Sequence, residues 1–324
     1  MPRRIPLPDD LGPSFTIRDA RAADIKPGRL RSADLTRPFS GVRARPTSTG
    51  LLSDEDPYAA QRGARVERAL LYAPRLRPGQ YFSHDTAAAI YGAPLPLERT
   101  SDGGIARGDD LALHVSTLGG GPLVRTAGVV HHRGDPRLVA VTAHAGLAVP
   151  TAPSTWAQSG AHSVSALIAL GDYFCRAWRA GAGRRDVGRA PFATVSELSA
   201  AMSAGRRIGA ARLREAISWI REDAWSPRES ELRYLLVSSG LPEPALNVDL
   251  FDEDGGFLGC WDMVFFAQRV AVEYHGRQHA DSWGADVERA ARLRAAGWII
   301  IDVTAESLRS PEVLVRRIRL ALSR

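Results

Sequence analysis

The segment from Val270 to His279 reads Val-Ala-Val-Glu-Tyr-His-Gly-Arg-Gln-His, so an apolar run typical of a buried strand ends in charged and titratable side chains. The strand expected before it, from Phe257 to Phe266, carries a further acid, Asp262. A carboxylate inside an apolar strand is costly to bury unless it has a partner. The fold must therefore bring these strands together in a way that satisfies their acids.

The pleat of the later strand decides which of its side chains share a face. Side chains alternate along a strand, so we expect Val270 and Val272 on one face and Ala271, Glu273 and His275 on the other. The acid and the histidine therefore point the same way.

A tight turn between the two strands would place Asp262 beside Glu273. Two carboxylates so close repel each other unless a cation lies between them. A magnesium ion held by one or two carboxylates, by waters and by a substrate phosphate satisfies such a pair. The alternative is an ion pair with an arginine, for which Arg269 and Arg289 are the candidates.

The elements around this acidic pair predict a mixed sheet flanked by helices. Their order is helix, three antiparallel strands, helix, strand and helix, with turn signals at 254–256 and at Gly297. The expected helices of residues 190–324 are 195–204, 210–220, 226–240, 286–296 and 312–322, and the expected strands are 246–251, 257–266, 269–274 and 298–303.

Glu229 lies in the first turn of the helix that opens with Ser226-Pro-Arg-Glu. From there it can reach the acidic pair as a further acid, directly or through water. Ser226 and Glu229 also match a capping box, in which the glutamate closes the helix N-terminus. The two interpretations do not exclude each other.

The N-terminal residues 1–56 have a different pattern. Helix-like stretches at 15–23 and 27–35 precede a turn into a strand at 37–43. Two short helices and a strand suggest a small winged-helix module that contacts DNA. A generic helical subdomain is the alternative, because the second stretch shows no obvious run of exposed polar side chains.

Residues 57–189 predict a small middle domain of mixed helices and strands. Ser83 is the expected N-cap of a short helix. Strands at 111–116 and 123–131 follow, joined as a hairpin by the glycine turn at 119–121. Further helices of this region are expected at 58–72 and 164–178.

Several histidines of the middle region lack the spacing of metal ligands. His131, His132 and His144 lie in strand-like segments without an acidic partner, so we expect structural or surface roles for them. His84, directly after Ser83, is ambiguous in the same way.

The composition excludes several classes of protein. Cys175 and Cys260 have no spacing typical of a disulfide framework or a zinc site, no signal segment opens the chain, and no apolar run approaches the roughly 20 residues that span a bilayer. We therefore expect a cytoplasmic protein without a membrane partner. The net charge of +6 suits a polyanion such as nucleic acid, although an arginine-rich chain with Lys26 as its only lysine also reflects a GC-rich genome.

The C-terminal motifs, taken in order, resemble a nuclease family. The pattern comprises Glu229 on a helix, Asp262, Glu273-Tyr-His-Gly-Arg-Gln-His279, Asp286-Val-Glu-Arg289 with Arg292, and Ala-Gly-Trp298 before an apolar strand. It is similar to the very-short-patch-repair (Vsr) endonucleases and, more closely, to the Vsr-related domain found at the C-terminus of actinobacterial proteins. Both belong to the PD-(D/E)XK, or restriction-endonuclease-like, fold, and the match covers about 226–322.

This resemblance implies roles for individual residues. Asp262 and Glu273 would be metal ligands, Glu229 an auxiliary acid, and His279 a group that activates water or stabilises the leaving group. His275 departs from the pattern, because the wider fold usually has lysine there. With no lysine nearby, the usual lysine-assisted mechanism is excluded. The fold would then serve either an altered enzyme or a binding module.

The front of the chain resembles a second family. Phe15-Thr, Arg29-Leu-Arg, Arg37-Pro-Phe-Ser-Gly-Val-Arg43 and Ser83-His-Asp-Thr-Ala-Ala88 are similar to AbiEi-type antitoxins and regulators. Those proteins begin with a winged helix and often precede nuclease-like ends. The likeness implies DNA contact at the N-terminus.

The hypothesis from the sequence is an α/β protein of the α+β kind with a metal-dependent endodeoxyribonuclease domain. Asp262 and Glu273 would hold Mg²⁺ or Mn²⁺, and His275 or His279 would manage the proton. Arginines would grip the DNA backbone, although the two on the helix can equally pair with Asp286 and Glu288. These arginines are Arg277, Arg289 and Arg292.

The rival hypothesis is a catalytically inactive DNA-binding regulator or antitoxin of the AbiEi type. An RNA-processing or recombination accessory protein is a third possibility, and a toxin or other protein partner is left open. The expected domains are 1–56, 57–189 and 190–324, with the nuclease-like core at 226–322.

Overall fold

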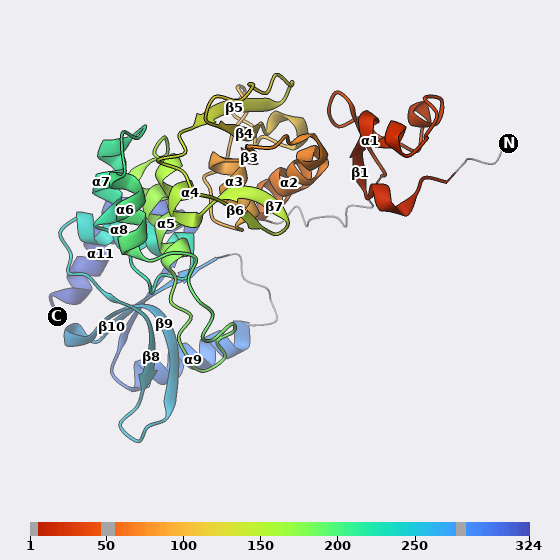
Figure 1. The fold of residues 1–324 in the computed structure, drawn as a ribbon. Helices are drawn as coiled ribbons and strands as arrows, with labels where there is room; N and C mark the ends of the chain where they lie inside the picture. Colours follow the sequence, from red (N-terminus) through yellow and green to blue (C-terminus); the bar gives the residue numbers. More distant parts are fainter. Residues whose placement is uncertain (1–5, 47–55, 277–282) are drawn as a thin grey trace. The chain divides into compact units, whose positions relative to one another are not determined.

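The structure is a computed structural model that describes residues 6–46, 56–276 and 283–324. Within these ranges helices alternate with four separate sheets, two antiparallel and two mixed (Figure 1). The α+β class expected from the sequence is therefore confirmed.

The chain divides into two units that interleave in sequence. The sequence predicts three consecutive domains, whereas here a helical segment, 197–210, belongs to the first unit although it follows part of the second. The three predicted domains stay predictions. The first unit is Met1–Ala161 with Glu197–Ala210, and the second is His162–Ser196 with Ala211–Arg324.

A pair of short strands opens the first unit. Strand β1 (Ser14–Thr16) pairs antiparallel with β2 (Val42–Ala44). Helix α1 (Ile17–Ala22) begins directly after β1, because the last residue of the strand and Asp19 form a capping box. The helix expected from Phe15 onward therefore begins only after a strand.

The second helix expected in this region, at 27–35, is wrong. The structure has there a single 3-10 turn, η2 (Arg29–Arg31). The Arg29 guanidinium donates to both carboxylate oxygens of Asp34, at 2.9 and 2.8 Å, so the segment bends back instead of extending a helix. The winged-helix module stays an expectation.

The middle of the first unit is a three-stranded sheet. Its strands β3 (Gln80–Phe82), β4 (Leu113–Leu118) and β5 (Val129–Gly134) lie in the order β3-β4-β5 (Figure 1). Helix α3 (His84–Ile90) leaves the end of β3 and buries its residues from Thr86 onward. The first residues of α3 therefore lie close to β4.

The expected hairpin at Gly119–Gly121 is wrong, because β5 runs parallel to β4. Parallel strands require the chain to return to the starting end of the sheet before the second strand begins. Residues 119–128 make that return, and β5 begins only at Val129. A glycine run signals a change of direction but not how far the chain travels before pairing.

Helix α2 (Pro57–Tyr72) shows how local signals set the helices of this region. Asp56 caps it by accepting the N–H of Tyr58 at 3.0 Å, and Pro57 occupies the first position, where no N–H is needed. The other elements between 6 and 161 are η1 (Asp9–Leu11), η3 (Ala73–Arg75), η4 (Gly108–Asp110), β6 (Val141–His144), β7 (Leu147–Pro150) and α4 (Ala152–Gln158).

The second unit contains a four-stranded mixed sheet in the order β11-β10-β9-β8 (Figure 1). Strands β8 (Ala245–Phe251), β9 (Phe257–Phe265) and β10 (Val270–His275) are antiparallel. Helix α9 (Trp283–Ala295) carries the chain across to β11 (Ile299–Thr304), which is parallel to β10. The predicted order of strands and helices is confirmed here.

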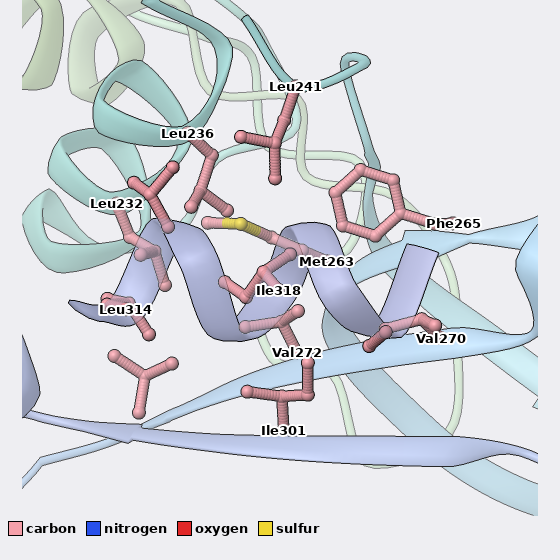
Figure 2. Close-up of a cluster of buried hydrophobic side chains, with 13 residues drawn as sticks. Leu232, Leu236, Leu241, Met263, Phe265, Val270, Val272, Ile301, Leu314 and Ile318 are labelled. Atoms are coloured by element: carbon pink, nitrogen blue, oxygen red, sulfur yellow. The ribbon is translucent and has the colours of Figure 1, made fainter. Parts of the chain in front are cut away.

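One face of this sheet packs on helices α8 (Pro227–Ser238) and α11 (Pro311–Leu322). Figure 2 shows Met263 and Val272 from the sheet facing Leu236 and Ile318 from the two helices. The opposite face buries Ala271 with residues of β9 and α9. The predicted alternation along β10 is therefore confirmed.

A buried ion pair joins α5 (Val164–Cys175) to α8. Arg233 and Asp172 are both almost fully buried and lie 3.1 Å apart. Arg233 also donates to the Trp219 carbonyl at 2.6 Å, and the Arg221 N–H donates to Asp172 at 2.7 Å. Burial raises the pKa of Asp172 to about 6, against the lowering effect of Arg233.

The remaining helices are short, and within the described ranges no helix has both the length and the apolar character needed to cross a bilayer. They are α6 (Val195–Ser203), α7 (Ala210–Ile217), η5 (Phe266–Gln268) and α10 (Ala305–Leu308).

Candidate acidic site on the C-terminal sheet

The register of β9 and β10 brings Asp262 and Glu273 together. Val272 pairs with Met263, so the next position along each strand sets Glu273 opposite Asp262 on the same face. The Asp262 N–H points to Glu273 Oε2 at 3.4 Å, and the Tyr274 N–H donates to Asp262 Oδ2 at 2.7 Å. The two carboxylates are thus neighbours, as the strand pattern predicts.

Glu229 reaches the same neighbourhood from the first turn of α8. Its carboxylate is buried, with only 6% of the residue exposed. The Glu229 N–H donates to Ser226 Oγ at 3.2 Å, which is the first half of the expected capping box. The carboxylate, however, accepts the N–H of Trp225 at 2.9 Å. Glu229 therefore satisfies the backbone N–H of the residue before the N-cap, Ser226, and not that of Ser226 itself.

The three acids lie near one another in a partly buried site, which raises the pKa of two of them. Burial, and then the negative charges of Glu229 and Glu273, raise the pKa of Asp262 to about 8. Burial likewise raises the pKa of Glu229. A carboxylate with such a pKa holds its proton at neutral pH unless a cation takes the place of that proton.

Asn247 on β8 is a polar residue of this site that none of the sequence motifs includes. Its side-chain amide donates to Glu229 Oε2 at 2.7 Å and to the Asp223 carbonyl at 2.6 Å. It is nearly buried and its backbone has φ +50, a conformation that asparagine tolerates better than most residues. The signal was present, since Asn247 stands between the apolar residues Leu246 and Val248 of the strand.

Arg289 on α9 is the cation that contacts the acids directly. Its Nη2 donates to Glu273 Oε1 at 2.8 Å, and its Nη1 donates to the Cys260 carbonyl at 2.8 Å. The guanidinium lies over the Trp261 ring, 4.5 Å from the centroid. The arginine expected either to grip DNA or to pair with an acid is therefore paired with Glu273, and also lies 3.5 Å from Asp286.

His275 follows the acids on the same face of β10. Its Nε2 lies 2.7 Å from Asp302 Oδ1 on the neighbouring strand β11. A carboxylate on one ring nitrogen fixes the orientation of the imidazole and favours the tautomer with its proton there. The expected proton-handling residue thus has an acid partner that the sequence did not indicate.

The other expected site residues fall in two groups. Arg292 is exposed on α9. Arg277 and His279 lie outside the described residues, so their expected roles stay predictions.

A cavity of about 360 Å³ adjoins Cys260, the residue before Trp261 on β9. Arginine and tryptophan side chains dominate its wall. The Arg176 guanidinium lies 3.9 Å from the centroid of Trp178, and that of Arg184 lies 4.7 Å from the centroid of Trp225. Stacked cations and aromatic faces beside an acidic site suit phosphates and bases.

No sequence motif marks this cavity, because its residues come from a glycine and arginine loop and from the approach to α8. Neither segment has a motif by itself. The wall also includes the exposed arginines Arg179 and Arg185.

Comparison with known proteins finds relatives that match part of the chain. No protein-family model matches the chain, and no solved structure matches it significantly. The chain is similar to uncharacterised proteins of two Mycobacterium tuberculosis strains, CDC 1551 and H37Rv, at 31% identity over 136 residues. That match covers 40% of this chain and 48% of each relative, so the chain spans about half the length of the curated relatives it matches.

Proposed function

We propose that the second unit acts on DNA as a Vsr-like, metal-dependent endonuclease in the cytoplasm, with Mg²⁺ or Mn²⁺ held by Asp262 and Glu273. The observation that carries this proposal is the pair of neighbouring carboxylates with buried Glu229 behind them. Burial and the adjacent acids raise the pKa of Asp262 to about 8, which marks a concentration of negative charge that a divalent cation relieves.

The donor atoms suit a hard cation. Asp262 engages the Tyr274 N–H through Oδ2, and Glu273 engages Arg289 through Oε1. Asp262 Oδ1, and Glu273 Oε2, which accepts the long Asp262 N–H contact at 3.4 Å through one lone pair, therefore keep acceptor capacity for an ion, and carboxylate oxygens are what Mg²⁺ prefers.

Each group of the site has a task in phosphodiester hydrolysis. A bound magnesium ion would lower the pKa of a water and neutralise the phosphate. His275, held at Nε2 by Asp302, would take or give a proton through its ring. The arginines and tryptophans around Cys260 would contact the DNA backbone and bases.

A non-catalytic DNA-binding regulator of the antitoxin type is the second candidate. The observation that favours it is Arg289, which already supplies a positive charge to Glu273. In the described residues, the carboxylate oxygens of the three acids also do not come within 4.8 Å of one another as one set. An arginine in this position stabilises the acidic site without a bound metal ion, so the domain would bind DNA without cleaving it.

Plasmid nicking separates the two candidates. Purified full-length protein is incubated with supercoiled and with mismatched DNA in Mg²⁺ or Mn²⁺, and DNA binding is measured in parallel. The endonuclease proposal predicts nicking that disappears in Asp262→Asn and persists in Asp254→Asn, an exposed acid of the β8–β9 turn. Binding without nicking in the unaltered protein supports the regulator instead.

A further inference from the structure

Three histidines from separate elements converge in the first unit. His84 is the first residue of α3, His114 lies on β4 and His132 lies on the neighbouring strand β5. A ring nitrogen of each lies within 4.8 Å of those of the other two. Among the residues described, no other set of three histidine, cysteine or acidic side chains meets this condition.

The three rings are in direct contact. His114 Nδ1 and His132 Nε2 are 2.9 Å apart, and the ring of His84 stacks on that of His132 with centroids 3.8 Å apart. A tetrahedral ion with metal–nitrogen bonds of 2.0–2.1 Å needs ligand nitrogens about 3.3 Å from one another. The His114–His132 separation is shorter than this value, and a ring nitrogen of His84 lies within 4.8 Å of both, so rotations of the rings would complete the arrangement.

Buried hydroxyl groups hold the cluster in place. Ser83 Oγ lies 3.0 Å from His84 Nδ1 and accepts a hydrogen bond from Ser116 Oγ at 2.8 Å. Thr86 Oγ1 accepts the backbone N–H of His114 at 2.8 Å. Ser83, Thr86 and Ser116 are all buried. Histidines that bind metals are usually oriented by such surrounding hydrogen bonds.

The backbone of His84 is strained towards this arrangement. It has φ +50, a left-handed conformation that costs free energy for a residue other than glycine. The α3 residues from Thr86 to Ile90 are buried and anchor the helix directly after His84. The strain is consistent with a position selected for what the ring does.

Other histidines of this unit have ordinary surroundings. His131 Nε2 lies 3.2 Å from Thr117 Oγ1, and His144 stacks on the ring of Tyr91 with centroids 4.4 Å apart. The expected structural role describes these two well. It does not describe His132, whose ring faces two other imidazoles.

We propose that His84, His114 and His132 form a binding site for a first-row transition-metal ion of the zinc class. Neutral imidazoles suit Zn²⁺, Co²⁺ or Ni²⁺, whereas Mg²⁺ prefers oxygen ligands. Three protein nitrogens leave the fourth position to water or to another ligand. The ion joins the start of α3 to β4 and β5, and this site is separate in chemistry from the carboxylate pair of the second unit.

Cobalt titration of the full-length, chelator-treated protein tests this site. We expect one equivalent of Co²⁺ to bind with the intense visible absorption of a four-coordinate ion. His132→Ala weakens this binding by more than about 100-fold, because it removes a ligand and not merely an outer partner. His131→Ala, on the adjacent position of the same strand, leaves the spectrum and affinity unchanged.

A second measurement covers the case in which His132→Ala folds poorly. Zn²⁺ should raise the melting temperature of the unaltered protein and of His131→Ala, but not that of His114→Gln, whose circular dichroism is checked first. The proposal is overturned if the unaltered protein shows only the weak absorption of hydrated cobalt. It is equally overturned if the His131 and His132 variants bind cobalt alike.

Discussion

Arg289 Nη2 lies 2.8 Å from Glu273 Oε1, so a helix that crosses from β10 to β11 supplies a positive charge to the acidic pair of the sheet. The aliphatic stem of Arg289 passes Gly259, where an added Cβ would lie only 2.8 Å from Arg289 Cδ. The guanidinium then rests on Trp261. This path holds the Arg289 guanidinium beside Glu273. A metal ion at the site must therefore bind next to the guanidinium or displace it.

Replacing Arg289 by glutamine should therefore change metal affinity and stability in opposite directions. Loss of the ion pair leaves a largely buried carboxylate without its cation, which should lower the free energy of unfolding by about 1–3 kcal/mol. Without the competing guanidinium, Mn²⁺ should bind up to about tenfold more tightly. Urea unfolding and calorimetry measure the two effects.

The control for Arg289 is Arg292→Gln, an exposed arginine on the same helix. It should leave both quantities within about 0.5 kcal/mol of the unaltered protein. Equal effects of the two substitutions would show that Arg289 has no special relation to the acids.

Asn247 should be essential for keeping Glu229 buried. Asn247→Asp preserves the shape of the side chain and tolerates the positive φ, but it replaces the donating amide by a second carboxylate. We expect a loss of at least about 2 kcal/mol at pH 7, since an unpaired buried acceptor and like charges both oppose folding. Chemical denaturation at pH 7 and pH 5 tests this, because the loss should shrink as carboxylates gain protons.

The C-terminal sheet could be predicted from the sequence for a specific reason. Alternation in Val270 to His275 defines the two faces of β10, and a tight turn leaves one register that buries the apolar side. Asp262 and Glu273 therefore become neighbours in any structure that respects the pattern. Arg289 was one of two candidates for their partner, and only the packing of α9 selects it.

The histidine cluster could not be predicted from the sequence in the same way. His84, His114 and His132 come from three elements, and the two strands pair in parallel through a long return segment, where the glycine turn predicts a hairpin. Parallel pairing is decided by the whole sheet and not by the residues of the turn. Ligand spacing in the sequence therefore carried no signal.

The buried pair of Asp172 and Arg233 should give stability a defined pH dependence. Burial raises the pKa of folded Asp172 to about 6, above the ordinary aspartate value of 3.8, so the folded state binds the proton more tightly than the unfolded state between these values. This contribution to stability is present below about pH 4 and is lost as pH rises through about 6.

Asp172→Asn has no proton to lose and should remove that dependence. The stability of the unaltered protein relative to this variant should fall by about 3 kcal/mol between pH 4 and pH 7. Urea midpoints across this range provide the measurement. A difference that stays constant, or that grows with pH, would sink the assignment.

The exposed arginines of the cavity near Cys260 should contribute to DNA affinity through phosphate contacts. Arg179→Ala and Arg185→Ala should each weaken binding to any duplex sequence and reduce the salt dependence of log K by about 1. Arg316→Ala, exposed on α11, is the matched control and should leave the salt slope unchanged. A sequence-selective loss would indicate base contacts in place of phosphate contacts.

The most direct test of the carboxylate site is a calorimetric titration of Mn²⁺ into full-length His132→Ala, in which the histidine cluster cannot contribute. The account predicts saturable heat with about one ion per chain, and loss of that heat in both Asp262→Asn and Glu273→Gln added to this background. Heat that is absent from the start, or that persists unchanged in both acid variants, would contradict it.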